Sequence, residues 1–216
     1  LFNKQNITKQ ERQIAKTVSF LIVYGGGAFN LAETMHIPHS RAEFIIESYK
    51  DVYPGVFEYM DFINNFIKSN GYAYTIFGRR RNLPDVGSSD FSVVNRAFRQ
   101  GLNFTIQSTA SDILLCGLLG IRNSFSANNL RAKIVSTVHD SIELVCPYEE
   151  LGEVASVVYD QLVNYPYIKE KFNIEFDVPL AIDVEAGCSF GESIPMVYSG
   201  GNLQNRDSVL EYMGVS

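Results

Sequence analysis

Tryptophan is absent from this 216-residue chain, and cysteine occurs only three times. Cys116, Cys146 and Cys188 are far apart and odd in number, so they form no metal-binding spacing, and we interpret them as reduced core thiols of an intracellular protein. The chain also lacks a run of about 18 apolar residues, so we expect no membrane span. Because no secretory leader and no initiator methionine are visible, we expect an intracellular, cytoplasmic protein.

Positive charge is scarce: 18 Lys and Arg stand against 24 Asp and Glu, and the formal net charge is −6. This balance argues against a generally basic nucleic-acid-binding surface. The cations are nevertheless concentrated, at Arg79–Arg81, Arg96 and Arg99 and near the N-terminus, whereas acidic residues gather in 143–160 and 169–192. Any nucleic-acid contact would therefore use a local basic cleft. Hydrophobic content of 46% supports a folded core in one or two domains.

The segment RQIAKTVSFLIVYG spaces two cations and two aromatic rings four residues apart, as Arg12, Lys16, Phe20 and Tyr24. On a helix this spacing forms one stripe about 18 Å long. Arg and Lys suit a polyphosphate, and aromatic rings suit a base or sugar through stacking. One helix face could therefore hold a nucleoside triphosphate. The alternative is an ordinary amphipathic helix with solvated cations and core aromatics.

A His-Asp pair lies between two short apolar runs, 133–137 and 141–145, that we predict to be strands of a hairpin. An exposed carboxylate on a rigid turn is a good hard-oxygen ligand for a divalent cation. Asp140 is therefore a candidate metal ligand, although an ordinary turn aspartate has the same sequence signature.

The remaining pattern predicts an α+β protein that is mostly helical. A capping box of Thr8 and Glu11 begins a helix over 8–24. The other predicted helices are 40–52, 55–69, a long or broken one over 91–125 with a kink near Gly101 or Gly117, and 148–164. A small hairpin is predicted around 72–76 and 81–83, and a last strand over 178–184.

Four segments in order resemble the family A DNA polymerases, the bacterial DNA polymerase I family. They are RxxxKxxxFxxxYG, GYAYTIFGRRRNLPDV at 71–86, RQGLNFTIQSTASDI at 99–113 and VHD at 138–140, and DVPLAIDVEAGCSF at 177–190 resembles the close of the family's domain. The resemblance covers about 11–190. It implies a helical fingers unit packed on a small antiparallel palm sheet, with fingers-like helices and a hairpin over 1–90, the C-terminal palm over 91–190, and a tail of unknown role over 191–216.

The resemblance implies roles for individual residues. Arg12 would grip the outer phosphates of a deoxynucleoside triphosphate, and Lys16 would contact those nearer the reacting centre and act in catalysis. Phe20 would lie beside the incoming sugar and base, and Tyr24 at the templating position. The primer-template DNA would be contacted by a further set of side chains, namely Arg99, Asn103, Gln107 and His139.

Asp140 would hold two Mg²⁺ ions together with a second carboxylate. Family members carry that aspartate in a DYS-like segment upstream of the Arg-Lys helix, and this chain begins eleven residues before Arg12. We therefore expect an upstream segment or subunit to complete the enzyme, and this chain alone to be inactive. For Arg79–Arg81 the resemblance leaves two roles open, contact with the DNA backbone or a structural ion pair.

Ser141 departs from the family, which usually has Glu after His-Asp. A His-Asp-Ser triplet is typical of the related single-subunit RNA polymerases, so an RNA polymerase-like enzyme is one alternative, although Phe20 and the two central segments favour DNA synthesis. A non-catalytic DNA-binding fragment is the other alternative, because the second metal-binding carboxylate is not found.

Overall fold

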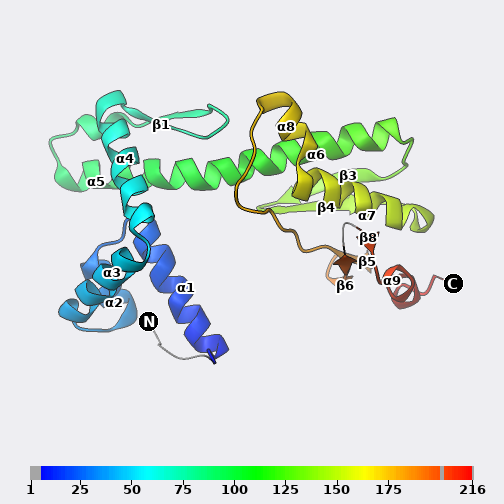
Figure 1. Ribbon diagram of the computed structural model, residues 1–216, viewed down its shortest axis with the longest axis horizontal. Coiled ribbons are helices and arrows are strands. Elements are labelled where there is room, and N and C mark those ends of the chain that lie inside the picture. The colour runs from blue at the N-terminus through cyan, green and yellow to red at the C-terminus, as the bar shows by residue number, and fades with distance from the viewer. Residues whose placement is uncertain (1–5, 200–201, 216) are drawn as a thin grey trace. The chain divides into compact units, whose positions relative to one another are not determined.

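The computed structural model describes residues 6–199 and 202–215, and Figure 1 labels its helices and strands. Contacts between residues divide the chain into two compact units, 1–109 and 110–216. The described residues are mostly helical, and their strands form two-stranded antiparallel sheets, which confirms the predicted α+β class. The division into fingers, palm and tail at 90 and 190 stays a prediction.

The first unit begins with helices and ends with a small hairpin and one further helix. Its described elements are α1 (Lys9–Val23), α2 (Ala28–Met35), α3 (His39–Val52), α4 (Pro54–Asn70), β1 (Tyr72–Tyr74), β2 (Arg80–Asn82), the 3₁₀ turn η1 (Pro84–Gly87), α5 (Phe91–Asn103) and the π-helical η2 (Phe104–Ser108). Strands β1 and β2 pair antiparallel with Ala73 opposite Arg81, as the predicted hairpin requires.

Helix α1 has the predicted beginning and end. The Thr8 hydroxyl accepts a hydrogen bond from the Glu11 backbone N–H at 3.2 Å, and the Thr8 backbone N–H donates to Glu11 Oε2 at 3.0 Å, which is a capping box. The helix ends before Gly25, whose φ of +76° lies in the left-handed region that glycine adopts without steric cost.

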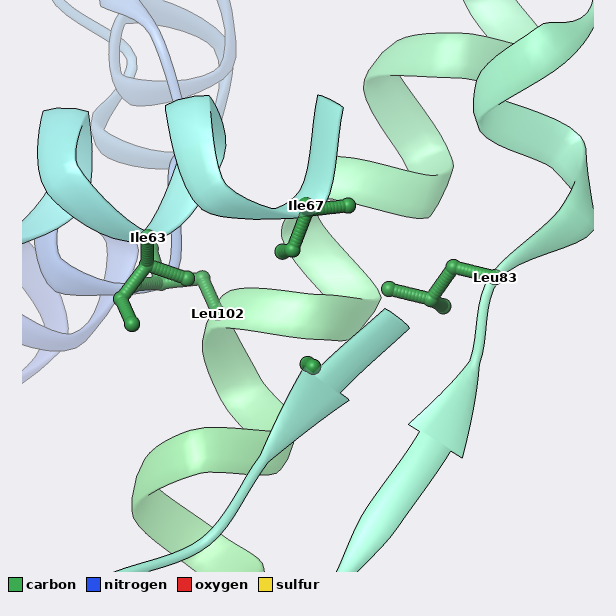
Figure 2. Packing of buried hydrophobic residues seen from close by; sticks show 5 residues of the cluster. Ile63, Ile67, Leu83 and Leu102 are labelled. Atoms are coloured by element: carbon green, nitrogen blue, oxygen red, sulfur yellow. The ribbon is translucent and has the colours of Figure 1, made fainter. Parts of the chain in front are cut away.

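Two apolar clusters hold the first unit together. Val18 and Ile22 of α1 pack with Leu31 of α2 and Ala42 of α3. The second cluster joins α4, β1 and α5 through Ile63, Ile67, Ala73, Leu83 and Leu102, and Figure 2 shows Ile63 of α4 beside Leu102 of α5 and Ile67 of α4 on the side of Leu83. All nine of these side chains are buried, so the opposite face of α1 is available to solvent.

The segment Phe91–Ala127 is helical throughout, from α5 through η2 to α6 (Thr109–Ala127). The helix changes from α-helical to π-helical at Phe104–Ser108, three residues after Gly101, and the predicted kink near Gly101 or Gly117 stays a prediction. Both glycines serve close packing: a Cβ on Gly101 would lie 2.3 Å from Ile67 Cδ1, and one on Gly117 would lie 2.3 Å from Leu162 Cδ2.

By length and composition alone, this helical segment could cross a membrane, a test that the core helix of a soluble protein also passes. Arg96, Arg99 and Arg122 lie along it, and its apolar residues supply buried positions to the cores of both units. These buried positions agree with a core helix, so we keep the expectation of no membrane span.

The second unit is built around a β-hairpin and helix α7. Its described elements after α6 are β3 (Lys133–Val138), β4 (Ser141–Val145), the 3₁₀ turn η3 (Tyr148–Glu150), α7 (Leu151–Tyr159), the π-helical η4 (Asp160–Asn164), α8 (Pro166–Phe172), β5 (Glu185–Ser189), β6 (Glu192–Pro195), β7 (Tyr198–Ser199), β8 (Asn202–Leu203) and α9 (Arg206–Tyr212). Ile121 and Phe125 of α6 pack with Val154 and Val158 of α7, and Leu144 of β4 borders this cluster.

The predicted strand over 178–184 was wrong. These residues have no strand assignment, Val178 lies in a bend, and the strands come later, at β5 and β6. Ile182 borders the cluster of α6 and α7, and Val184 borders a separate cluster, so side-chain packing explains the apolar pattern. Pro179 lacks the N–H that a ladder needs.

The described residues of the tail, 191–199 and 202–215, pack against α7 through several apolar side chains. Met196 and Val209 are buried with Leu151 and Ala155 of α7, so α7 is apolar on both of its long faces. The ring of Tyr198 stacks on Tyr159, with centroids 5.0 Å apart and planes at 21°. The tail is therefore an integral part of the second unit.

Candidate functional site

The four-residue stripe of α1 is real, and it faces away from the core. Arg12, Lys16 and Phe20 are exposed and Tyr24 is half-buried, whereas Val18 and Ile22 on the other side are buried. The Lys16 ammonium lies 5.5 Å from the centroid of the Phe20 ring. Phe20 and Tyr24 stack at 5.7 Å with planes only 7° apart. The alternative interpretation, an ordinary amphipathic helix, would require both aromatic rings in the core. The rings lie instead on the outer face of α1.

The exposed end of α1 is joined to the segment that follows α5. Tyr24 Oη lies 3.2 Å from Gln107 Nε2, which donates a hydrogen bond to it. A Cβ added to Gly25 would lie 3.1 Å from Arg99 Cγ, so the Arg99 side chain passes over this glycine. The structure thus brings two of the predicted DNA-contacting residues to the end of the predicted nucleotide-binding stripe.

Asn103 behaves differently from its two predicted companions. Arg99 and Gln107 are exposed, but Asn103 is half-buried, and its Oδ1 is buried without a hydrogen-bond partner among the described residues. The spacing of four assumes a regular α-helix, whereas Gln107 lies in the π-helical η2. The wider π turn rotates the later residue relative to the earlier ones. Gln107 therefore does not continue the line that Arg99 and Asn103 would form on a regular α-helix.

The arginines of the β1–β2 hairpin stack on aromatic rings. The Arg79 and Arg81 guanidinium carbons lie 5.5 and 6.0 Å from the Phe104 centroid, and that of Arg80 lies 4.6 Å from the Tyr72 centroid. Arg79 also donates to the Ser108 carbonyl at 3.1 Å. Cation–π contact is a role that the sequence did not suggest for them, and it positions the hairpin against η2.

In the second unit, the predicted hairpin forms with a two-residue turn. Val138 pairs with Ser141, so His139 and Asp140 are the turn itself, and both are exposed. His139 has a φ of 55°, in the left-handed region. The Asp140 carboxylate therefore stands at the end of two paired strands, where solvent and ligands can reach it.

Ser141 is hydrogen-bonded beside this turn. Its Oγ lies 3.0 Å from the Val138 carbonyl oxygen and 3.0 Å from Glu143 Oε1, to either of which the hydroxyl can donate. Glu143 and Ser141 thus lie on one face of β4, as alternation along a strand predicts. Glu143 is half-buried and was not predicted to bind metal.

Metal binding by the described residues would rest on few ligands. Residues 6–199 and 202–215 contain no group of three or more His, Cys, Asp or Glu side chains that could hold an ion. Asp140 offers an accessible hard-oxygen donor of the kind that Mg²⁺ prefers. The donor chemistry at this turn therefore fits Mg²⁺, but a complete site needs ligands from elsewhere.

The base of the hairpin is fixed by an ion-pair network that sequence reasoning missed. Arg131, just before β3, donates from its backbone N–H to Glu150 Oε2 at 2.8 Å and from Nε to Glu150 Oε1 at 2.7 Å. It also pairs with Glu149. The hydrogen bonds from Arg131 hold the pKa of both glutamates below the usual range. Only the run of two acids after Pro147 hinted at this role.

Comparison with known proteins identifies the class. The model for "DNA polymerase family A" matches residues 1–192. The chain therefore belongs to DNA polymerase family A, as the ordered segments and the exposed stripe indicated.

Individual relatives agree with this assignment. The chain is 33% identical over 189 residues to DNA polymerase I of Lactococcus lactis and 33% identical over 194 residues to the DNA polymerase of Bacillus phage SP01. In both comparisons the match covers 88% of this chain and 21% of the relative. The chain thus spans about a fifth of the length of these relatives.

A solved structure is also similar, the polymerase domain of Pol1 from M. smegmatis in complex with DNA primer-template and dNTP. It has a TM-score of 0.75 and 30% sequence identity, and the match covers 82% of this chain and 30% of that one. Residues 193–216 lie beyond the family match, so the tail that packs on α7 is outside the shared region.

Proposed function

We propose that this chain supplies the nucleotide-binding helix and one metal-binding turn of a template-directed DNA polymerase. The observation that carries the proposal is the exposed face of α1, on which Arg12, Lys16, Phe20 and Tyr24 follow one another over a buried apolar face. The reaction is attack of a primer 3′-hydroxyl on a deoxynucleoside triphosphate with release of pyrophosphate.

The two cations act on the triphosphate. Arg12 holds the outer phosphates with a planar fork, and Lys16 contacts the phosphates nearer the reacting centre. Charge grows on these oxygens during phosphoryl transfer, so a fixed ammonium stabilises the transition state more than the ground state. Phe20 and Tyr24, already stacked on each other, offer ring faces to the incoming sugar and base and to the templating position.

Asp140 would hold Mg²⁺, the ion that the family generally uses. The chemistry that bound Mg²⁺ would supply is activation of the attacking oxygen and stabilisation of the leaving oxygen. One exposed carboxylate cannot fix two cations roughly 4 Å apart. We therefore propose that a second carboxylate comes from an upstream segment or subunit, which is supported by the match covering only 21% of the relative's length.

DNA is held by side chains that suit the minor groove and the primer end. Arg99 and Gln107 present donors, and acceptors occur in the minor groove of every base pair, so such contacts check pair geometry rather than sequence. Asn103 joins them with a half-buried amide, and His139 contacts the primer end beside Asp140. The relatives named above are bacterial and phage polymerases, which supports an intracellular site of action.

Primer extension tests the proposal. The purified 216-residue chain should not extend a primer, whereas the chain joined to or mixed with the upstream polypeptide of its own polymerase should do so with deoxynucleotides and Mg²⁺. Asp140→Ala in the completed enzyme should abolish extension, while Asp207→Ala, an exposed carboxylate of α9, should not. Preferred incorporation of ribonucleotides would favour the RNA polymerase-like alternative, and robust extension by the chain alone would contradict the need for a second carboxylate.

A further inference from the structure

Gln107 has a partner within the protein that competes with the role proposed for it on DNA. Its Nε2 donates to Tyr24 Oη at 3.2 Å, so an exposed amide of η2 is turned toward a half-buried phenol at the end of α1. The phenol is itself fixed by stacking on Phe20. The bond therefore ties the end of the nucleotide-binding helix to the segment proposed to read the minor groove.

Hydrogen bonds from neighbouring elements hold η2 in place around Gln107. Tyr59 of α4 donates from its hydroxyl to Thr105 Oγ1 at 2.9 Å, and Thr105 is buried. Arg79 donates to the Ser108 carbonyl. Thr105 and Ser108 thus anchor the two ends of η2, and the exposed Gln107 between them is the side chain that can change partner.

The position of the Gln107 amide makes the two partners alternatives. Minor-groove edges present acceptors on every base pair, and both N–H donors of a glutamine are on Nε2, so this one atom must reach whichever partner it binds. The groove is about 6 Å wide and 7.5 Å deep, so the side chain must extend away from the protein to reach a base edge. A nitrogen held 3.2 Å from a half-buried phenol of the same unit lies against the protein surface instead.

We propose that Gln107 is a latch on Tyr24 that primer-template DNA releases. Without DNA the amide holds the Tyr24 hydroxyl, and on DNA the amide turns to a minor-groove acceptor and leaves Tyr24 able to move relative to η2. The proposal rests on the proposed function for the DNA contact, but the latch itself stands on the geometry of the protein. One consequence is that the latch opposes DNA binding, because a binding-competent side chain must first be freed.

A double-mutant cycle of duplex affinities tests whether DNA releases Gln107 from Tyr24. Fluorescence anisotropy would give the affinity of a primer-template duplex for the 216-residue chain and for Tyr24→Phe, Gln107→Ala and the double variant. Tyr24→Phe keeps the ring and removes the competing acceptor, so it should strengthen binding by about three- to tenfold, the range of one net hydrogen bond. Gln107→Ala should weaken binding, and Tyr24→Phe should then have no effect in the Gln107→Ala chain.

The matched control is Tyr59→Phe, which removes a phenol hydroxyl that also bonds η2 but through the buried Thr105. It should leave duplex affinity unchanged. Weaker duplex binding by Tyr24→Phe would contradict the proposal that DNA releases Gln107 from Tyr24. So would an equal effect of Tyr24→Phe in the unsubstituted chain and in the Gln107→Ala chain.

The latch has a separate test without DNA. Urea unfolding of the same four proteins should show that the effects of Tyr24→Phe and Gln107→Ala on the folding equilibrium are not additive, with a coupling of about two- to tenfold. Additive effects would overturn the latch. Failure of the unsubstituted chain to bind the duplex would instead overturn the proposed function together with the release, so the two failures are distinguishable.

Discussion

The Arg99 side chain crosses directly over Gly25, so closely that a Cβ on this glycine would lie 3.1 Å from Arg99 Cγ. Gly25 also has a φ of +76°. A glycine is therefore favoured twice at this point, by the left-handed backbone that ends α1 and by the close approach of an arginine from α5.

Gly25→Ala should consequently affect both folding and DNA binding. The left-handed backbone costs an alanine about 1–2 kcal/mol, and the free energy of unfolding should fall by that amount. Displacement of Arg99 should also weaken binding of a primer-template duplex. Urea unfolding and anisotropy titration measure the two effects.

The control for this variant is Gly55→Ala, in the first turn of α4, where a Cβ would meet nothing within 4 Å and φ is not positive. It should leave duplex binding unchanged. Normal stability and normal duplex affinity in Gly25→Ala would show that Arg99 does not depend on this close approach.

Much of the first unit could be predicted from local sequence signals. The capping box of Thr8 and Glu11 and the periodic apolar residues of α1 and α4 determine helices by themselves. The bond between Tyr24 and Gln107 could not be predicted, because it depends on a π-helical turn that has no recognised sequence signature. The cation–π contacts of Arg79 and Arg81 depend on the same turn, since Phe104 begins it.

Phe20→Tyr should make the completed polymerase accept dideoxynucleotide terminators. A tyrosine hydroxyl can help to fill the place of the missing 3′-hydroxyl, whereas phenylalanine offers no polar partner. The Phe20 ring is 46% exposed, so the added hydroxyl can be accommodated without repacking. We expect the ratio of kcat/KM for a deoxynucleotide to that for its dideoxy analogue to fall by roughly one to two decades.

Phe44→Tyr, at another exposed ring of the same unit, is the control and should leave the ratio unchanged. Free acceptance of terminators by the unsubstituted enzyme, or an unchanged ratio in Phe20→Tyr, would show that Phe20 does not face the sugar.

Tyr198→Phe should stabilise the second unit. The Tyr198 hydroxyl is buried without a hydrogen-bond partner among the described residues, and burial raises the pKa of Tyr198 to about 12. Removal of an unsatisfied hydroxyl should raise the free energy of unfolding by about 1 kcal/mol, because the stacking on Tyr159 is kept.

The same residue should make stability sensitive to alkali. The phenol of Tyr198 ionises near pH 10 in the unfolded chain but stays neutral up to about pH 12 in the folded one. Its titration therefore does not reduce the free energy of unfolding below pH 10, and reduces it increasingly as pH rises toward 12. Tyr198→Phe should reduce this loss, and Tyr148→Phe, at an exposed phenol, should not. Identical alkaline unfolding of Tyr198→Phe and the unsubstituted chain would contradict the burial of this hydroxyl.

The second unit was harder to predict because its packing depends on contacts between segments that are far apart in the sequence. The hairpin around Asp140 follows from two adjacent apolar runs. The tail does not, since Met196 and Val209 are buried in a cluster with Leu151 and Ala155 of α7, which lie about forty to sixty residues earlier in the sequence. Val184, whose apolar neighbourhood in the sequence had suggested a strand, is packed against the same cluster.

Lys16 is the proposed contact to the reacting phosphates, and the assignment of the α1 stripe to the triphosphate depends on it most. In the completed enzyme, single-turnover kinetics should show that Lys16→Ala lowers the rate of the chemical step by roughly a hundredfold or more, the effect of losing one electrostatic donor. Arg12→Ala should act mainly on nucleotide affinity, and Lys68→Ala, at an exposed cation of α4, should change neither. A near-normal chemical rate in Lys16→Ala would contradict the assignment of the α1 stripe to the triphosphate.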